Sequence, residues 1–234
     1  GGFPDWTAWH SASGTTKEPP YARLEPRFQA TILYNGADWK GRKIEPYVGG
    51  TDGWATWKTD KEPKGKTVTG YYLRKLVDET YDVNTSASSQ PFNILRYAEV
   101  LLNKAEACYR TGDAAGANAA VKAIRTRVGL PYTDKSDSEL WKAIRQERKV
   151  ELAYEGLQYW DQRRWESAEK QYPEGLAGYQ QHGFKIEKNG SEYTYTYVSV
   201  DDKDRNFPSK LYRFPLPASE LNSNSSVEQY PEWK

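Results

Sequence analysis

The most regular hydrophobic pattern in the chain lies in residues 91–130, which read PFNILRYAEVLLNKAEACYRTGDAAGANAAVKAIRTRVGL. Apolar side chains recur there at steps of three and four, which predicts one apolar stripe along each of two helices. These positions are Ile94, Ala98, Leu101, Ala105 and Cys108, followed by Ala117, Ala120, Val121, Ile124 and Val128. Only Thr111 and Gly112 separate the two runs, and Asp113 can cap the second helix. So short a connection predicts an antiparallel helical hairpin.

Small residues dominate this hairpin, and its length is close to that of one tetratricopeptide unit. In repeat proteins such a unit buries its faces by stacking on neighbours, and a single unit cannot do so alone. The sequence therefore predicts further helices beside the hairpin, either in this chain or in residues that have been removed from it.

The segments around the hairpin complete the predicted fold. Residues 136–156 form a third helical pattern with Ser138 as the expected cap, and residues 157–168 form a fourth. Residues 192–200 alternate tyrosine with threonine as an edge strand does, and residues 29–34 also resemble a strand. We predict a mainly α fold, in which a tetratricopeptide-like helical hairpin and further helices are joined by long loops and a few short β-strands.

The chain is expected to form one domain with three parts. Residues 1–90 are a loop-rich segment with short strands, since glycine, proline, tryptophan and charged residues interrupt every regular pattern. Residues 91–168 are the helical core, with the hairpin at 91–130 and the later helices at 136–168. Residues 169–234 are a loop and strand elaboration at the C-terminal end.

Composition excludes several classes of function. The chain has 33 Lys and Arg against 32 Asp and Glu, a net charge of +1, so we expect no nucleic-acid partner. Cys108 is the only cysteine, which leaves no disulfide framework and no thiolate metal site. No apolar stretch approaches the length of a membrane span.

Motifs for metal or cofactor binding are also missing. His10 and His182 lack a zinc-type spacing. Asp202, Asp204 and Asn206 resemble the start of a calcium loop, but the glycine that such a loop requires is replaced. Phosphate-binding glycine loops, nucleophile elbows and dinucleotide fingerprints do not occur. We therefore expect no metal, no cofactor and no catalytic residue.

Glu147, Glu151 and Glu155 are the one arrangement that suggests an enzyme. Their four-residue spacing places three carboxylates on one helix face, as a glycoside hydrolase could use. However, basic residues crowd the same region, and carboxylates among guanidinium groups form ion pairs with low pKa values. These basic residues are Arg145, Arg148, Lys149, Arg163 and Arg164. We interpret the cluster as structural, with a glycoside hydrolase that uses Glu147 and Glu151 as the weaker alternative.

Loop tryptophans are the other chemical feature. Trp6, Trp9, Trp54 and Trp57 lie where no helical period places them in a core. The apolar face of a sugar ring stacks on an indole, and nearby polar side chains can bind its hydroxyls. The same tryptophans could instead pin irregular structure to the protein.

Several blocks of sequence, taken in order, carry a family resemblance. They are Glu25–Phe28 with Ala30–Gly36, Gly70–Lys75, Ile94–Leu102, Ile124–Pro131, Glu147–Gly156, Tyr159–Trp165, Leu211–Pro217 and Glu220–Asn222. Together they resemble the SusD/RagB family, surface nutrient-binding lipoproteins of Gram-negative bacteria. The resemblance covers roughly residues 20–234, which in that family is the C-terminal half.

This resemblance implies a function. Family members bind a glycan or related nutrient without chemistry and pass it to a SusC-like TonB-dependent transporter. The resemblance further implies a missing helical N-terminal half, a lipid anchor, and a place on the extracellular face of the outer membrane. The matching blocks include Arg96, Glu99, Glu151 and Trp160, and the resemblance implies that these residues determine the fold and do not bind the ligand.

No ligand-binding residue can be carried over by motif, so the site prediction depends on the loop aromatics. We predict that Trp6, Trp9 and His10 bind the glycan, with Trp54 and Trp57 as a second group. The rival hypothesis is a helical-repeat scaffold for protein–protein interaction, in which the aromatics serve an interface or the core.

Overall fold

The computed structural model describes residues 19, 21–59, 65–82, 84–85, 87–91, 93–171, 175–178, 180–201 and 203–234. It divides into two compact units. The first comprises Gly1–Glu155 and His182–Val200, and the second comprises Gly156–Gln181 and Asp201–Lys234.

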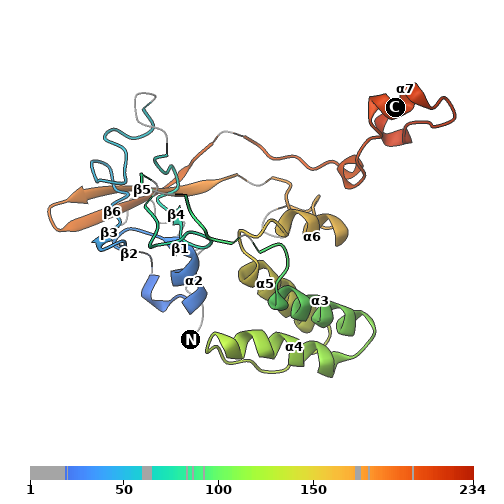
Figure 1. The fold of residues 1–234 in the computed structure, drawn as a ribbon, viewed down its shortest axis with the longest axis horizontal. Helices are drawn as coiled ribbons and strands as arrows, with labels where there is room; N and C mark the ends of the chain where they lie inside the picture. Colours follow the sequence, from blue (N-terminus) through green and yellow to red (C-terminus); the bar gives the residue numbers. More distant parts are fainter. Residues whose placement is uncertain are drawn as a thin grey trace. The chain divides into compact units, whose positions relative to one another are not determined.

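Three helices form the helical part of the first unit: α3 (Tyr97–Arg110), α4 (Ala114–Arg127) and α5 (Asp137–Glu151). Helices α3 and α4 lie side by side as a hairpin, and α5 packs against both (Figure 1). The Asp113 carboxylate accepts a hydrogen bond from the backbone N–H of Gly116 at 2.8 Å, so it caps α4 as expected. The mainly α fold with a helical hairpin is thereby confirmed.

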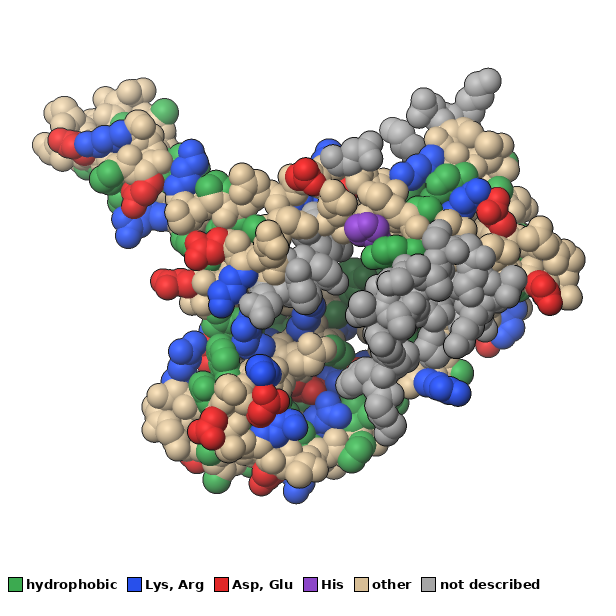
Figure 2. Space-filling model, turned by 180° about the vertical axis from the view of Figure 1, so that it is seen from behind, with side chains coloured by type: hydrophobic (Ala, Val, Ile, Leu, Met, Phe, Trp, Pro, Cys, Tyr) green, Lys and Arg blue, Asp and Glu red, His purple; other side chains and the backbone are tan. Residues whose placement is uncertain are grey.

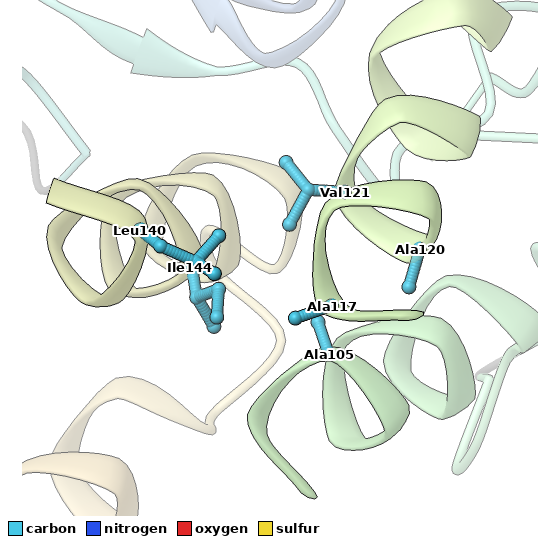
Figure 3. Close-up of a cluster of buried hydrophobic side chains, with 6 residues drawn as sticks. All are labelled: Ala105, Ala117, Ala120, Val121, Leu140 and Ile144. Carbon is cyan, nitrogen blue, oxygen red and sulfur yellow. The ribbon is translucent and has the colours of Figure 1, made fainter. Parts of the chain in front are cut away.

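A small, close-packed core holds these three helices together (Figure 3). Its buried members are Ala105, Ala117, Ala120, Val121, Leu140 and Ile144. Because alanine has only a methyl group, α3 and α4 approach closely, and the larger Leu140 and Ile144 of α5 fill the space beside them. Helix α5 is thus the neighbour that the hairpin pattern requires.

The starts of α3 and α5 differ from the predicted ones. Ile94 and Leu95 precede α3 and are 90% and 63% exposed, because Arg96 adopts an extended backbone and the helix begins at Tyr97. Ser136, not Ser138, occupies the N-cap position of α5.

The segment predicted as a strand at residues 29–34 is a strand only at its centre, Ile32–Leu33, and residues 29–31 are helical. Helix α2 (Pro26–Thr31) follows the short 3₁₀ turn η1 (Tyr21–Arg23) and precedes β1 (Ile32–Leu33). Pro26 stands in the first helical turn, where its fixed φ and missing N–H are favourable. Strand β1 pairs antiparallel with β4 (Tyr72–Leu73).

Two hairpins complete the β part of the first unit, beside the β1–β4 pair. Strands β2 (Asp38–Trp39) and β3 (Arg42–Lys43) are joined by Lys40 and Gly41, whose φ values of 47° and 78° match the positive values of a type I′ turn. The longer hairpin comprises β5 (His182–Asn189) and β6 (Glu192–Ser199), of which only β6 was predicted. Its inner face buries Phe184, Ile186 and Tyr195 against Tyr47.

The second unit contains α6 (Gln158–Arg164), η2 (Ser209–Tyr212), α7 (Ala218–Ser223) and η3 (Pro231–Trp233). Arg163 is its buried centre. The Arg163 guanidinium donates to the backbone oxygen of Tyr212 at 2.8 Å and lies 4.2 Å from the centroid of the Phe214 ring. Helix α6 ends at Arg164, short of the predicted residue 168.

We predict that Gly183→Ala destabilises the β part of the first unit. A Cβ atom at this position would lie 2.3 Å from the Cα of Thr69, and the adjacent Phe184 N–H donates to the Thr69 oxygen, so neither backbone can move away freely. Urea unfolding should show a loss of about 1–3 kcal/mol. The control Ser191→Ala, in the exposed turn of the same hairpin, should change stability by less than about 0.5 kcal/mol. Equal stability of both variants would contradict the close approach.

Candidate functional site

The three glutamates of the predicted cluster lie at the C-terminal end of α5. Glu147 and Glu151 are each only 3% exposed. The Arg27 guanidinium of α2 reaches both of them, and its Nη1 lies 2.6 Å from Glu147 Oε1 and 2.8 Å from Glu151 Oε2. Its other nitrogens bind Glu25. One buried arginine therefore joins residues more than a hundred positions apart in the sequence.

Further cations complete the cluster from other elements. Arg96, just before α3, binds Glu151 and Glu155 at 2.7 Å. Arg125 and Arg127, at the end of α4, bind Glu147 at 3.0 Å and Glu151 at 2.8 Å respectively. Each carboxylate thus faces more than one positive charge.

Lys75 closes the end of the same helix. Its ammonium donates to the backbone oxygens of Glu151 and Ala153 and to the Glu155 carboxylate, at 3.0, 2.9 and 2.6 Å. These oxygens lie where a helix ends without intrahelical partners and carries partial negative charge. Lys75 thus binds both the end of the helix and the cluster.

The structural interpretation of these glutamates is consistent with their electrostatics. Burial acts to raise the pKa of Glu151, but hydrogen bonds from Arg96 and Arg27 outweigh it and hold that pKa below its ordinary value. The pKa of Glu155 is lowered in the same way, against burial, by Arg96 and Lys75. A carboxylate that stays ionised is a poor general acid.

The partners of the cluster differ from those predicted. The prediction named basic residues of the same stretch, whereas the contacts come from α2, the loop at Lys75, the start of α3 and the end of α4. Arg148 instead donates to Asn103 Oδ1 at 2.7 Å, and Arg163 lies in the core of the second unit. Contacts between residues so distant in sequence leave no local pattern.

The predicted binding residues fall in two places. Trp6, Trp9 and His10 lie outside the described residues. Trp54 and Trp57 are both half-buried in the loop that follows β3. The Trp54 indole N–H donates to the Thr67 backbone oxygen at 2.8 Å, which pins this side chain, whereas Trp57 makes no hydrogen bond to another described residue.

Residues 48–58, which include Trp54 and Trp57, are called the tryptophan loop here. This loop is attached to the β5–β6 hairpin at two points. The Val48 N–H donates to the Ile186 oxygen at 2.8 Å. Beyond the tryptophans, the Lys58 ammonium donates to the oxygens of Ser199 and Val200 at 3.2 and 3.1 Å. The intervening turn requires Gly53, because a Cβ there would lie 1.8 Å from the Tyr47 oxygen. Trp54 and Trp57 are therefore carried on a loop with fixed ends.

An open cavity of about 380 Å³ lies beside this loop. Its lining residues are Leu33, Trp39, Arg42, Ile44, Asp52, Gly65, Lys66, Tyr72 and Leu73. The sequence analysis did not predict Trp39 as a site residue. Its position directly before the Lys40–Gly41 turn was a usable signal, because a tryptophan at the end of a two-residue strand is only partly covered by neighbouring side chains.

Other kinds of site find no support in the part of the chain that the structure describes. No group of three or more His, Cys, Asp or Glu side chains there could hold a metal ion. His182 stacks on the Tyr197 ring at 4.7 Å. On the face shown in Figure 2, acidic and basic side chains of the described residues are interspersed. None of the described helices has the length and apolar character needed to cross a membrane.

We predict that Glu151→Ala lowers the free energy of unfolding by about 3–5 kcal/mol, because it removes the buried carboxylate that Arg27, Arg96 and Arg127 share and leaves excess positive charge there. Equilibrium urea unfolding measures this loss. Glu139→Ala is the matched control, since Glu139 pairs with Lys142 on the same helix but is 65% exposed, and a loss below about 0.5 kcal/mol is expected. A Glu151→Ala protein that stays as stable but loses hydrolysis of chromogenic glycosides would instead support a glycoside hydrolase.

The lowered pKa values of Glu151 and Glu155 also predict acid sensitivity. A carboxyl group whose pKa is lower when folded contributes stability above its unfolded pKa, near 4.3, and loses it as pH falls through the folded pKa. The free energy of unfolding should therefore decrease below about pH 5. Glu155→Gln should reduce that slope, and an unchanged slope would show that Glu155 does not contribute.

Comparisons with known proteins agree with this fold. A sequence model of the SusD family matches residues 1–233. No curated protein matches the chain. A crystal structure of a SusD-like protein from Bacteroides fragilis is 31% identical, with a TM-score of 0.70 over 88% of this chain and 38% of its own. The structure of selenomethionine BT4246 is 25% identical, with a TM-score of 0.71 over 89% of this chain and 37% of its own.

A SusD superfamily protein from Bacteroides vulgatus shares the fold at 20% identity, with a TM-score of 0.54 over 90% of this chain and 40% of its own. The chain therefore covers 37–40% of the length of these three solved structures. The expected resemblance is confirmed by a match along nearly the whole sequence and by the likeness to a SusD-like crystal structure. The chain belongs to the SusD family.

Proposed function

We propose that the chain is part of a cell-surface protein that binds an oligosaccharide or related nutrient and delivers it to a SusC-like TonB-dependent transporter of the outer membrane. Family membership supports this role, and the observation that carries it is the pair of half-buried indoles on an anchored loop. Indole faces are suitable surfaces for the apolar face of a sugar ring.

The proposed glycan site uses Trp57 and Trp54 together with Trp6, Trp9 and His10. Trp57 is the strongest described candidate. Trp54 donates its N–H to Thr67 and can offer only its ring. Such a shallow site stacks on only a few sugar rings and buries little of the ligand surface. We therefore expect dissociation constants in the micromolar to millimolar range.

Binding in this proposal involves no chemistry on the ligand. Glu147 and Glu151 are the two carboxylates that the glycoside hydrolase alternative would use. Both are buried and paired with arginines. Their function is then to hold the protein together, and the ligand leaves unchanged.

We further propose that an N-terminal helical half, bearing the lipid anchor on the extracellular face of the outer membrane, packs against this chain. The exposed apolar side chains around the start of α3 support it: Ile94, Leu95, Tyr97 and Val100 are 90, 63, 73 and 45% exposed. Exposed apolar patches of this kind mark interaction sites, and a packed helical half is the partner proposed here. The same patch would suit the alternative of a helical-repeat scaffold that binds a protein.

The glycan proposal predicts that Trp57→Ala weakens binding about tenfold, because it removes the stacking surface. A glycan array first identifies the ligand, and calorimetric titration then compares the variants. Trp233→Phe, a change to a half-buried indole of the second unit, should leave the affinity unchanged. If Trp57→Ala, Trp6→Ala and Trp9→Ala all bind as the unmodified chain does, the indoles are not the site.

A further inference from the structure

The open cavity beside the tryptophan loop has the composition of a ligand site. Small-molecule sites are mostly apolar, with volumes of roughly 300–1,000 Å³ and a few placed polar groups. This cavity, of about 380 Å³, is within that range. Its apolar lining includes Leu33 and Ile44, which are 3% and 4% exposed, and the rings of Trp39 and Tyr72.

The polar groups of the cavity are held in place by the protein. Arg42 and Asp52 form two parallel hydrogen bonds, both 2.6 Å long, and the Glu45 N–H donates to the same carboxylate at 2.8 Å. Tyr72 donates its hydroxyl to the Asp52 backbone oxygen at 2.5 Å. The hydrogen bond from Arg42 lowers the pKa of Asp52, so this group remains a hydrogen-bond acceptor at neutral pH. Binding to groups that are already held in place costs less conformational entropy than binding to mobile side chains.

These cavity-lining groups retain unused hydrogen-bonding capacity. Among the described residues, Asp52 Oδ1 accepts one hydrogen bond, from Arg42, and an ionised oxygen can accept two. Arg42 donates three of its five N–H groups, two to Asp52 and one to the Lys43 oxygen. The Lys66 ammonium donates to the Thr51 oxygen at 2.6 Å and has further N–H groups available.

We propose that this cavity binds one pyranose ring of the glycan, as a subsite separate from the loop indoles Trp54 and Trp57. The inference rests on the proposed function. An indole and a tyrosine ring supply apolar surface for the ring face. Asp52 accepts from one hydroxyl while Arg42 or Lys66 donates to its neighbour, which suits the paired hydroxyls of a sugar.

The cavity that Trp39 lines also lies next to the tryptophan loop. We therefore expect one oligosaccharide to contact both the cavity and the loop indoles. Asp52 belongs to that loop, two residues before Trp54. Lys66 precedes Thr67, whose backbone oxygen accepts from the Trp54 indole and whose N–H donates to the Tyr72 hydroxyl. A longer glycan would therefore gain from two connected contacts, each weak alone.

The experiment is fluorine NMR of the intact chain carrying 5-fluorotryptophan, with the Trp39 resonance assigned from Trp39→Phe. The probes are the methyl pyranosides of glucose, galactose, mannose and xylose, titrated into the millimolar range. We expect at least one probe to shift the Trp39 resonance saturably. Lys66→Ala should weaken that response at least about threefold, by removing a donor from the cavity. Lys43→Ala removes a neighbouring ammonium that does not line the cavity, and it should have no effect.

The outcomes separate this inference from the proposed function. A Trp39 resonance that no probe shifts, or one that Lys66→Ala and Lys43→Ala affect equally, overturns the cavity assignment. If Trp54 or Trp57 responds while Trp39 does not, the glycan function stands and the cavity proposal fails. If Trp39 responds but the glycan array shows no ligand for the chain, the cavity binds sugar and the broader function fails. Trp160, which is 54% exposed in the second unit, reports nonspecific stacking.

Discussion

The first unit depends on one buried carboxylate that three guanidinium groups share. Glu151 is bound by Arg27 of α2, by Arg96 ahead of α3 and by Arg127 at the end of α4. A charge removed from water is tolerated only where opposite charges and hydrogen bonds surround it. The elements that carry these arginines must therefore meet at the end of α5. Their meeting joins α2, at the start of the β part, to the helical hairpin. A cluster of this kind accounts for the glutamate spacing without any catalytic role.

The proposed glycan site lies away from this cluster, on the loops and short ribbons of the β part. The helices bury alanine, leucine and isoleucine, whereas the described surface of the β part offers tryptophan and tyrosine beside a few charged groups. This division has a physical cause. Regular helices with small side chains pack closely and leave no hollow, while irregular backbone held by glycines leaves spaces that aromatic rings only partly fill. A binding protein can thus keep its scaffold while its loops change.

Local patterns predicted the helices well because the signal for a helix lies in neighbouring residues. The hairpin at 91–130, its Asp113 cap and the third helix needed only the spacing of apolar side chains. The same reasoning missed α2 and began the strand too early, at residue 29, although Pro26 favours a helical start. Strand β5 was missed because its alternation is short: only Phe184 and Ile186 are apolar, and Lys185 and Glu187 are the polar residues that follow them. The partners of Glu151 could not be predicted at all, because Arg27 is 124 positions away in the sequence.

The double attachment of the tryptophan loop has a consequence for recognition. Val48 and Lys58 tie the two sides of this loop to the β5–β6 hairpin, and Gly53 permits the tight turn between them. Much of the conformational entropy of this segment is therefore lost when the protein folds, not when a ligand arrives. If the proposed glycan binds there, a flexible polymer has to order mainly itself, so even a shallow contact retains it.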